Sequence, residues 1–178
     1  DQINLYLPVP VFRFPRWHVC SICSSMQRAG SGTSGRVRCK SCESKMPLTQ
    51  TRFIAACENG CVMDFPWREW VFEKKSSELS SDEKGARLHY KGGNSVNEIT
   101  VKALAPKSDK VIVQRTLRGA FGSSTGNEGT RSNLSSHLLK DGNDRFTCPG
   151  CQPWLKATKK DGCGADLHPT LISASNAY

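Results

Sequence analysis

The chain has 178 residues, 37% of them hydrophobic, so it is long enough for one domain or two small ones but lean for a single large core. No stretch approaches the roughly 20 apolar residues of a membrane span, and no charged-then-apolar signal segment is visible, which argues against a membrane protein. Nine cysteines lie mostly in short pairs, three of the form C-x2-C and one C-x3-C. These spacings are typical of metal ligands rather than of a secreted disulfide framework, and they predict a reducing, cytoplasmic compartment.

The net charge of +9 is unevenly distributed. Residues 1–50 carry seven Lys/Arg against two Asp/Glu (+5), residues 51–100 seven against eight (−1), and residues 101–178 eleven against six (+5). Two basic ends around a near-neutral middle would suit contact with a polyanion, although the same charge can serve solubility alone. DNA is therefore a candidate partner.

The N-terminal segment is apolar but is interrupted by Pro8 and Pro10, which predicts an edge strand or an extended arm over residues 4–14. The sequence FRFPRW at residues 12–17 then interleaves aromatic rings with Arg13 and Arg16. Guanidinium groups can meet phosphates, and the neighbouring rings can stack on an unpaired base. Arg13 and Arg16 are thus candidate nucleic-acid contacts; the alternative is a packing segment that leads into the first cysteine pair.

The first four cysteines form two knuckles separated by fifteen residues, Cys20 with Cys23 and Cys39 with Cys42. This is the spacing of a zinc ribbon, in which two knuckles complete a tetrahedron of thiolates. Four thiolates leave no open position for water, so the site should be structural rather than catalytic. His18 lies close by but is surplus to a complete four-cysteine set.

The rest of the chain is organised around residues 51–71. A short apolar run, 53–56, predicts a buried strand, and the Cys57–Cys61 loop that follows contains Gly60, which is free to take a positive φ. The aromatic cluster DFPWREW at 64–70 is expected to supply much of the apolar burial. Two thiolates alone cannot close a tetrahedral site, so this loop must take ligands from elsewhere in the chain.

Further along, residues 73–95 are charged and Ser-rich, which predicts a solvated loop or polar insertion. Residues 97–105 alternate like a strand, with Ile99, Val101 and Ala103 on one face, and 110–114 form a second β-branched run. Together with the strand at Phe53, these runs predict a small antiparallel sheet, and 115–122 reads as a short helix or turn.

These patterns predict a small α+β fold that is rich in strands and loops. We expect an N-terminal arm and zinc ribbon over residues 1–50, followed by a second zinc-stapled module over residues 51–178.

The C-terminal part supplies three further cysteines, Cys148, Cys151 and Cys163, so that with the Cys57–Cys61 loop five thiols compete for four places. By geometry alone, Cys148 and Cys151 form the better knuckle. The loop before Cys163 is rich in lysine, and its members form a second candidate patch for nucleic-acid contact: Lys156, Lys159 and Lys160.

Four segments, taken in order, carry a resemblance to a known family. They are FRFPRW at 12–17, RFIAACENGCVMDFPW at 52–67, CPG with PWL at 148–155, and ASN at 174–176. They resemble DrmB, the zinc-binding component of the DISARM anti-phage defence system. The resemblance implies a prokaryotic, cytoplasmic protein that partners the DrmA helicase in DNA-directed defence. DrmB-like proteins are far longer than this chain, so a fragment or shortened member is expected.

The resemblance also bears on the ligands. The family usually has His where this chain has Cys61, and it has a later cysteine like Cys163 rather than one at position 151. It therefore implies a second ligand set of Cys57, Cys61, Cys148 and Cys163, and hence two structural Zn²⁺ ions in the chain.

We expect a non-enzymatic accessory module that scaffolds the helicase, contacts DNA together with it, and has no small-molecule substrate. One alternative is a general zinc-ribbon nucleic-acid-binding protein. The other is a catalytic nuclease subunit, which would need an open metal site, whereas the four histidines (18, 89, 137 and 168) are scattered singly.

Overall fold

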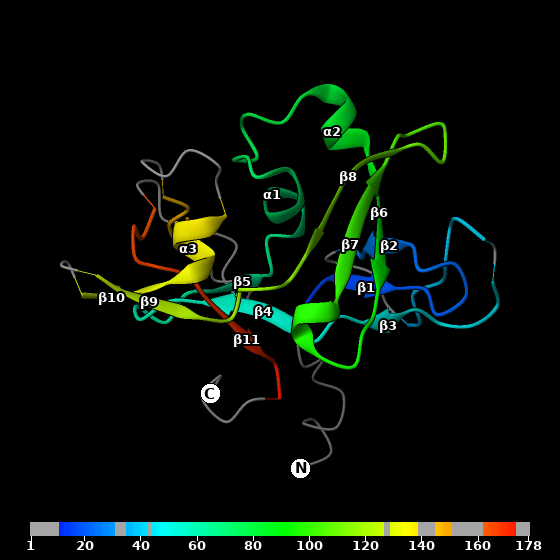
Figure 1. The fold of residues 1–178 in the computed structure, drawn as a ribbon. Helices are drawn as coiled ribbons and strands as arrows, with labels where there is room; N and C mark the ends of the chain where they lie inside the picture. The colour runs from blue at the N-terminus through cyan, green and yellow to red at the C-terminus, as the bar shows by residue number, and fades with distance from the viewer. Residues whose placement is uncertain are drawn as a thin grey trace, which may run out of the picture.

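The computed structural model describes residues 11–30, 35–42, 44–126, 129–138, 145–150 and 162–173 (Figure 1). Within these ranges the longest strand and the longest helix each have six residues, and loops connect most elements. The predicted small, strand- and loop-rich fold is therefore confirmed. None of the described helices has the length and apolar character needed to cross a bilayer.

The first sheet contains the strands β1 (Trp17–Val19), β2 (Met26–Arg28) and β3 (Thr49–Gln50), in the antiparallel order β2-β1-β3. The β1–β2 turn and the segment before β3 both carry cysteines, so this sheet is the frame of the first cysteine set. Trp17 and Met26 are buried in the same apolar cluster as residues of the second half of the chain. A domain boundary at residue 50 remains a prediction.

The second sheet has the predicted buried strand at its centre. β4 (Phe53–Ala56) lies between β5 (Val62–Asp64) and β11 (His168–Leu171), and both neighbours are antiparallel to it. β11 therefore returns the end of the described chain to its middle, with Leu171 opposite Phe53. This pairing brings the C-terminal cysteines toward the loop between β4 and β5.

The third sheet consists of β6 (Arg87–Lys91), β7 (Thr100–Leu104) and β8 (Val111–Thr116), with the short 3-10 helix η2 (Val96–Glu98) between β6 and β7. The predicted strands near 97–105 and 110–114 are confirmed as β7 and β8, and Val101 and Ala103 are buried as expected. The prediction that they share a sheet with β4 is wrong, because β7 pairs with β6 and β8 instead.

The expectation of a solvated loop at 73–95 is also wrong for much of this segment. It contains the helix α2 (Ser81–Gly85), which starts with a capping box between Ser80 and Glu83, and the strand β6. Few residues here are apolar, but Leu79 and Leu88 are buried in the main core. Composition averaged over the segment hid this pattern, because α2 itself has no buried residue and the few buried side chains lie on either side of it.

The core is built around the aromatic cluster that the sequence predicts. The helix α1 (Trp67–Phe72) places Trp67 and Trp70 at 1% exposure, beside the fully buried Phe65. The Phe65 and Trp67 ring centroids lie 4.6 Å apart, and Phe53 meets Trp67 edge to face at 5.9 Å. Such ring contacts stabilise the core beyond what the burial of these large side chains contributes.

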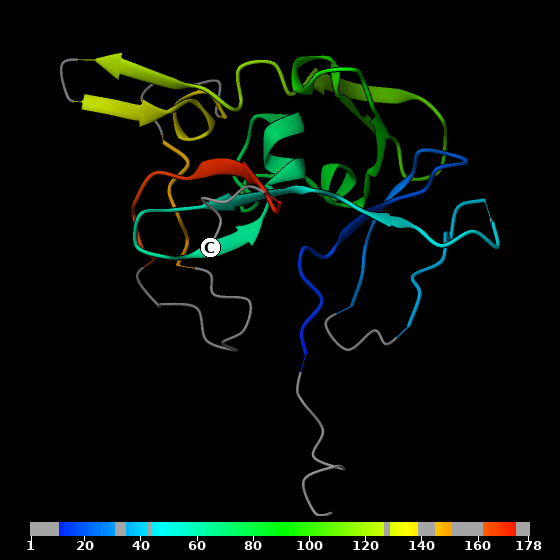
Figure 2. The same ribbon diagram turned by 90° about the horizontal axis from the view of Figure 1, so that it is seen from below.

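The remaining described elements lie at one side of the molecule. The hairpin of β9 (Ser123–Gly126) and β10 (Gly129–Ser132) leads into the short helix α3 (Asn133–His137). Figures 1 and 2 show this group on the opposite side from β1 and β2, with α1 between them. Leu134 and Leu138 are fully buried in the main core.

Candidate metal centres

The first centre is assembled by local backbone geometry. Cys20 and Cys23 lie in the turn between β1 and β2, where the Cys20 N–H donates to the Ser25 carbonyl (3.0 Å) and the Ser24 N–H donates to the Cys20 carbonyl (2.9 Å). Ser24 takes a positive φ of 62°, which tightens this turn. The turn points both sulfurs to one side, as a metal knuckle requires.

The partner knuckle is held by pairing with the segment before β3. The Leu48 N–H donates to the Val37 carbonyl (2.8 Å), and Arg38 forms an isolated β-bridge with Pro47. Cys39 and Cys42 follow directly on this paired segment. Across the site, sulfur–sulfur distances are 3.6 Å for both Cys20–Cys42 and Cys23–Cys39.

The second centre joins two segments that are distant in the sequence. In the loop between β4 and β5, the Cys57 N–H donates to the Cys61 carbonyl (3.0 Å), and Gly60 has the positive φ (72°) that the sequence predicts. In the other segment, the Cys163 N–H donates to the Cys148 carbonyl (3.0 Å), and Gly162 before it has a φ of 70°. The two segments meet with 3.7 Å between the sulfurs of Cys57 and Cys163.

Each set fits a tetrahedral metal ion. In both, the four sulfur atoms lie within 4.8 Å of one another. A Zn–S bond of about 2.3 Å implies sulfur–sulfur edges of roughly 3.8 Å in a tetrahedron, close to the observed 3.6 and 3.7 Å. A disulfide would instead need about 2.05 Å. Both tetrads can therefore hold a metal ion.

The electrostatics of the second set favour a central cation. Burial raises the pKa of the Cys148 thiol to about 12, whereas the hydrogen bond from Asn59 is the main cause that lowers the pKa of Cys163 to about 7. Four thiols at this separation cannot all ionise without an opposing charge, because like charges repel at short range. A metal ion would supply that charge when bound.

Several donors to the sulfurs were missed by sequence reasoning. In the first set, Gln27 Nε2 lies 3.5 Å from the sulfur of Cys39, and the Ser41 N–H lies 3.3 Å from it. In the second, Asn59 Nδ2 lies 3.0 Å from the sulfur of Cys163. The position of Asn59 between two ligand cysteines was a usable signal; nothing local marked Gln27, which reaches Cys39 from β2.

The structure brings together all eight cysteines that the sequence analysis named as ligands, whereas Cys151 lies outside the described residues. These are the only groups of three or more His, Cys, Asp or Glu with metal-binding geometry in the described part of the chain. Three of the four histidines, His18, His89 and His168, sit on three different sheets, in β1, β6 and β11.

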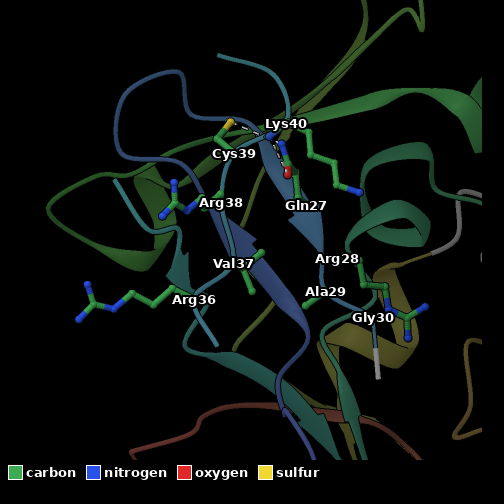
Figure 3. Close-up of a pocket in the computed structure, with 9 residues that line it drawn as sticks. All are labelled: Gln27, Arg28, Ala29, Gly30, Arg36, Val37, Arg38, Cys39 and Lys40. Atoms are coloured by element: carbon green, nitrogen blue, oxygen red, sulfur yellow. Dashed lines mark hydrogen bonds between the residues drawn. The ribbon is translucent and has the colours of Figure 1, made fainter. Parts of the chain in front are cut away.

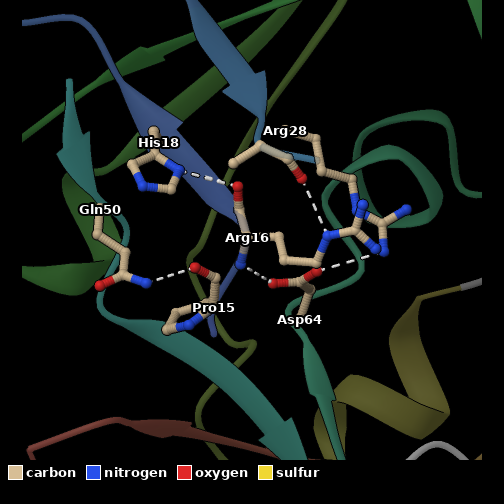
Figure 4. A network of polar contacts seen from close by, with 7 residues as sticks. Pro15, Arg16, His18, Arg28, Gln50 and Asp64 are labelled. Carbon is tan, nitrogen blue, oxygen red and sulfur yellow. Dashed lines mark hydrogen bonds and ion pairs between the residues drawn. The ribbon is translucent and has the colours of Figure 1, made fainter. Parts of the chain in front are cut away.

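Arg16, a candidate DNA contact, has structural partners at the start of β1 (Figure 4). Its backbone N–H donates to Asp64 Oδ1 (2.7 Å), and its side-chain Nε donates to the Ala29 carbonyl (3.0 Å). Asp64 also forms an ion pair with Arg28 at 3.4 Å. The guanidinium of Arg16 thus ties the start of β1 to the end of β2, and its backbone N–H ties it to β5.

The other candidate nucleic-acid contacts differ in how exposed they are. Arg13 Nη2 donates to the Gly35 carbonyl (2.6 Å), and this contact is exposed. Trp17 is 9% exposed and belongs to the main core, so its ring is packed rather than free to stack on a base, whereas Phe12 is 48% exposed. The second candidate patch, Lys156, Lys159 and Lys160, lies outside the described residues.

The fold and the two sulfur sets define a small, strand-rich protein with places for two metal ions. A family model described as a domain of unknown function, DUF8724, matches residues 2–178, and the chain belongs to this family. It is also similar to the DISARM protein DrmB of Bacillus paralicheniformis (strain ATCC 9945a / NCIMB 11709 / CD-2), with 26% identity over 180 residues. That match covers 96% of this chain but only 27% of the relative, so the chain spans about a quarter of its length.

Proposed function

We propose that the chain is a non-catalytic, zinc-binding accessory module of a DISARM-type anti-phage defence complex. The observation that carries the proposal is the pair of four-sulfur sets, in which cysteine occupies every position of a tetrahedral site. Such sites are structural, because no position is left for water or substrate. The similarity to a DISARM protein supports the setting in defence.

In this proposal, Zn²⁺ occupies both sets and contributes folding free energy to the sheets around them. The module works in the prokaryotic cytoplasm, binds a DrmA-like helicase and contacts DNA together with it. The helicase partner rests on the similarity to DrmB, and the excess of positive charge supports a DNA contact.

The test is purification of the full chain from cells that also produce the DISARM helicase, followed by elemental analysis and identification of the co-eluting proteins. We expect about two zinc ions per chain and a co-eluting helicase. Iron in place of zinc, or fewer than two metal ions, would contradict the metal assignment. Co-elution of RNA polymerase or ribosomes in place of the helicase would support a general zinc-ribbon nucleic-acid-binding protein. Metal-dependent cleavage of DNA would support a nuclease subunit.

A further inference from the structure

A basic groove lies beside the first cysteine set, between β2 and residues 36–40 (Figure 3). Its volume is about 670 Å³. The described residues that line it include four cationic side chains and no acidic one: Arg28, Arg36, Arg38 and Lys40. Clefts lined by one sign of charge concentrate the electrostatic field and attract ions of the opposite sign.

The backbone of residues 36–40 directs their cationic side chains toward solvent. Exposure alternates along the segment, with Arg36, Arg38 and Lys40 exposed and Cys39 buried toward the metal site. The segment is fixed by its pairing with residues 47 and 48 and by the bond from Arg13 to the Gly35 carbonyl. In Figure 3 the head groups of Arg36 and Arg38 project to the same side. In an extended chain, residues two apart are separated by roughly 6.6 Å.

Among the residues that the structure describes, few acidic groups offset the positive charge of the groove. Arg28 is the exception, because Asp64 lies 3.4 Å from its guanidinium. Within the described ranges, the head groups of Arg36, Arg38 and Lys40 have no hydrogen-bond or ion-pair partner. As far as the described residues show, three exposed cations on one segment therefore face solvent without a counter-charge.

We propose that this groove binds the phosphodiester backbone of a nucleic acid strand, with Arg36 and Arg38 as the principal contacts. The guanidinium fork matches phosphate geometry. In Figure 3 the head groups of Arg36 and Arg38 project to one side and those of Arg28 and Lys40 to the other. The four therefore do not converge on one point, which suits a chain of phosphates better than a single anion. This inference deepens the DNA contact of the proposed function and locates it at residues other than Arg16.

A competing role for these cations is to offset the charge of the metal site itself, since four thiolates around Zn²⁺ are formally dianionic. The two roles differ in their consequences. A compensating cation lowers metal affinity or stability when it is removed, whereas a phosphate contact changes only nucleic-acid binding. Arg36 and Arg38 are exposed, so their loss is expected to change stability by about 0.5 kcal/mol at most.

The experiment measures binding of the full chain to labelled oligonucleotides of about 20 nucleotides, longer than the roughly 4–16 nucleotides of a single-strand site. Fluorescence anisotropy across a salt series compares the wild type with Arg36→Ala/Arg38→Ala. The matched control is Lys107→Ala/Lys110→Ala, which removes the same charge from exposed positions in the loop between β7 and β8. Single-stranded DNA, duplex DNA and RNA are tested separately to distinguish the source of the backbone.

We expect the arginine variant to bind more weakly and to lower the salt slope by about 1.8 on duplex DNA, from two contacts of about 0.9 each, or by about 1.4 on a single strand. The lysine control should keep the wild-type slope. Equal slopes for all three proteins, equal losses in both variants, or competition by polyglutamate as strong as by unlabelled oligonucleotide would overturn the proposal. Loss of zinc from the arginine variant would also overturn it, in favour of charge compensation. Zinc content and helicase co-elution of the wild type test the proposed function separately.

Discussion

The two sets each consist of four cysteines but occupy different places in the fold. The first draws its members from residues 20–42 and lies in a small cluster of its own, with Cys20, Cys39 and Leu48 as its buried members. The second joins Cys57 to Cys163, 106 positions apart, and three of its four cysteines belong to the main core. The first set thus lies in a local unit, and the second lies in the core of the chain.

Loop length alone does not explain this difference. Cross-linking Cys57 to Cys163 closes a span of 106 positions, against 22 for Cys20 and Cys42. In the chain-entropy model the longer loop gains only about 1.4 kcal/mol over the shorter one. The larger difference comes from packing, because the second set shares buried surface with the aromatic residues of α1. Loss of a ligand from the second set is therefore expected to unfold the whole core. Loss of a ligand from the first set is expected to unfold only the residues around it.

The largest effect is expected from Cys148→Ser, which removes a buried ligand of the second set. The chain should lose one metal ion and its cooperative fold, since structural zinc contributes about 10–16 kcal/mol and a whole domain is stable by only about 5–15 kcal/mol. Tryptophan fluorescence and the metal content of the soluble fraction measure this outcome. Cys57→Ser, Cys61→Ser and Cys163→Ser should behave in the same way.

The matched control is Cys151→Ser, three residues further along the chain. It should keep two metal ions and the native fluorescence. If Cys151→Ser loses a metal ion while Cys163→Ser keeps both, the fourth ligand is Cys151 and the second set is assigned incorrectly.

A smaller effect is expected from Cys42→Ser in the first set. This variant should also lose one metal ion but keep the main core, because Trp67 and Trp70 lie in the other cluster. Its tryptophan emission should stay close to that of the wild type, while limited proteolysis should cut within residues 20–48. A complete loss of native fluorescence would show that both sets stabilise one cooperative unit.

The main core is also stabilised by an arginine side chain that lies outside both cysteine sets. The guanidinium carbon of Arg115 lies 3.7 Å from the centroid of the Trp70 ring, and its Nη1 donates to the carbonyls of Trp70 (2.7 Å) and Leu138 (3.3 Å). Arg115→Lys keeps the charge but loses the fork. We expect a loss of roughly 2–3 kcal/mol in urea unfolding with both metal ions retained. The exposed Arg118→Lys is the control and should change stability by less than about 0.5 kcal/mol.

The smallest effect is expected from the donors to sulfur. Asn59→Ala removes the 3.0 Å contact to the Cys163 sulfur, and Gln27→Ala removes the 3.5 Å contact to the Cys39 sulfur. Outer partners of metal ligands typically change metal affinity by about 10–100-fold, and we expect Asn59→Ala to exceed Gln27→Ala because its contact is shorter. Zinc release to a competing chelator measures both. The reverse order would mean that the first site depends more strongly on its surroundings.

The sequence by itself determined the local features of this protein. The C-x2-C spacings identify the first cysteine set, the run at Phe53 identifies a buried strand, and Gly60 between two cysteines identifies a tight turn. Each of these depends on neighbours a few residues apart, where backbone geometry limits the choices.

Only the tertiary structure decided what depends on distant segments. Backbone bonds between Cys148 and Cys163 bring the later cysteine into the second set, and the pairing of β11 with β4 delivers both to the loop between β4 and β5. The partners of Arg16 and the burial of Leu88 within a charged segment were equally invisible in the sequence. The physical reason is that long-range pairing is selected by the sum of packing over the whole core, which no single spacing or local composition encodes.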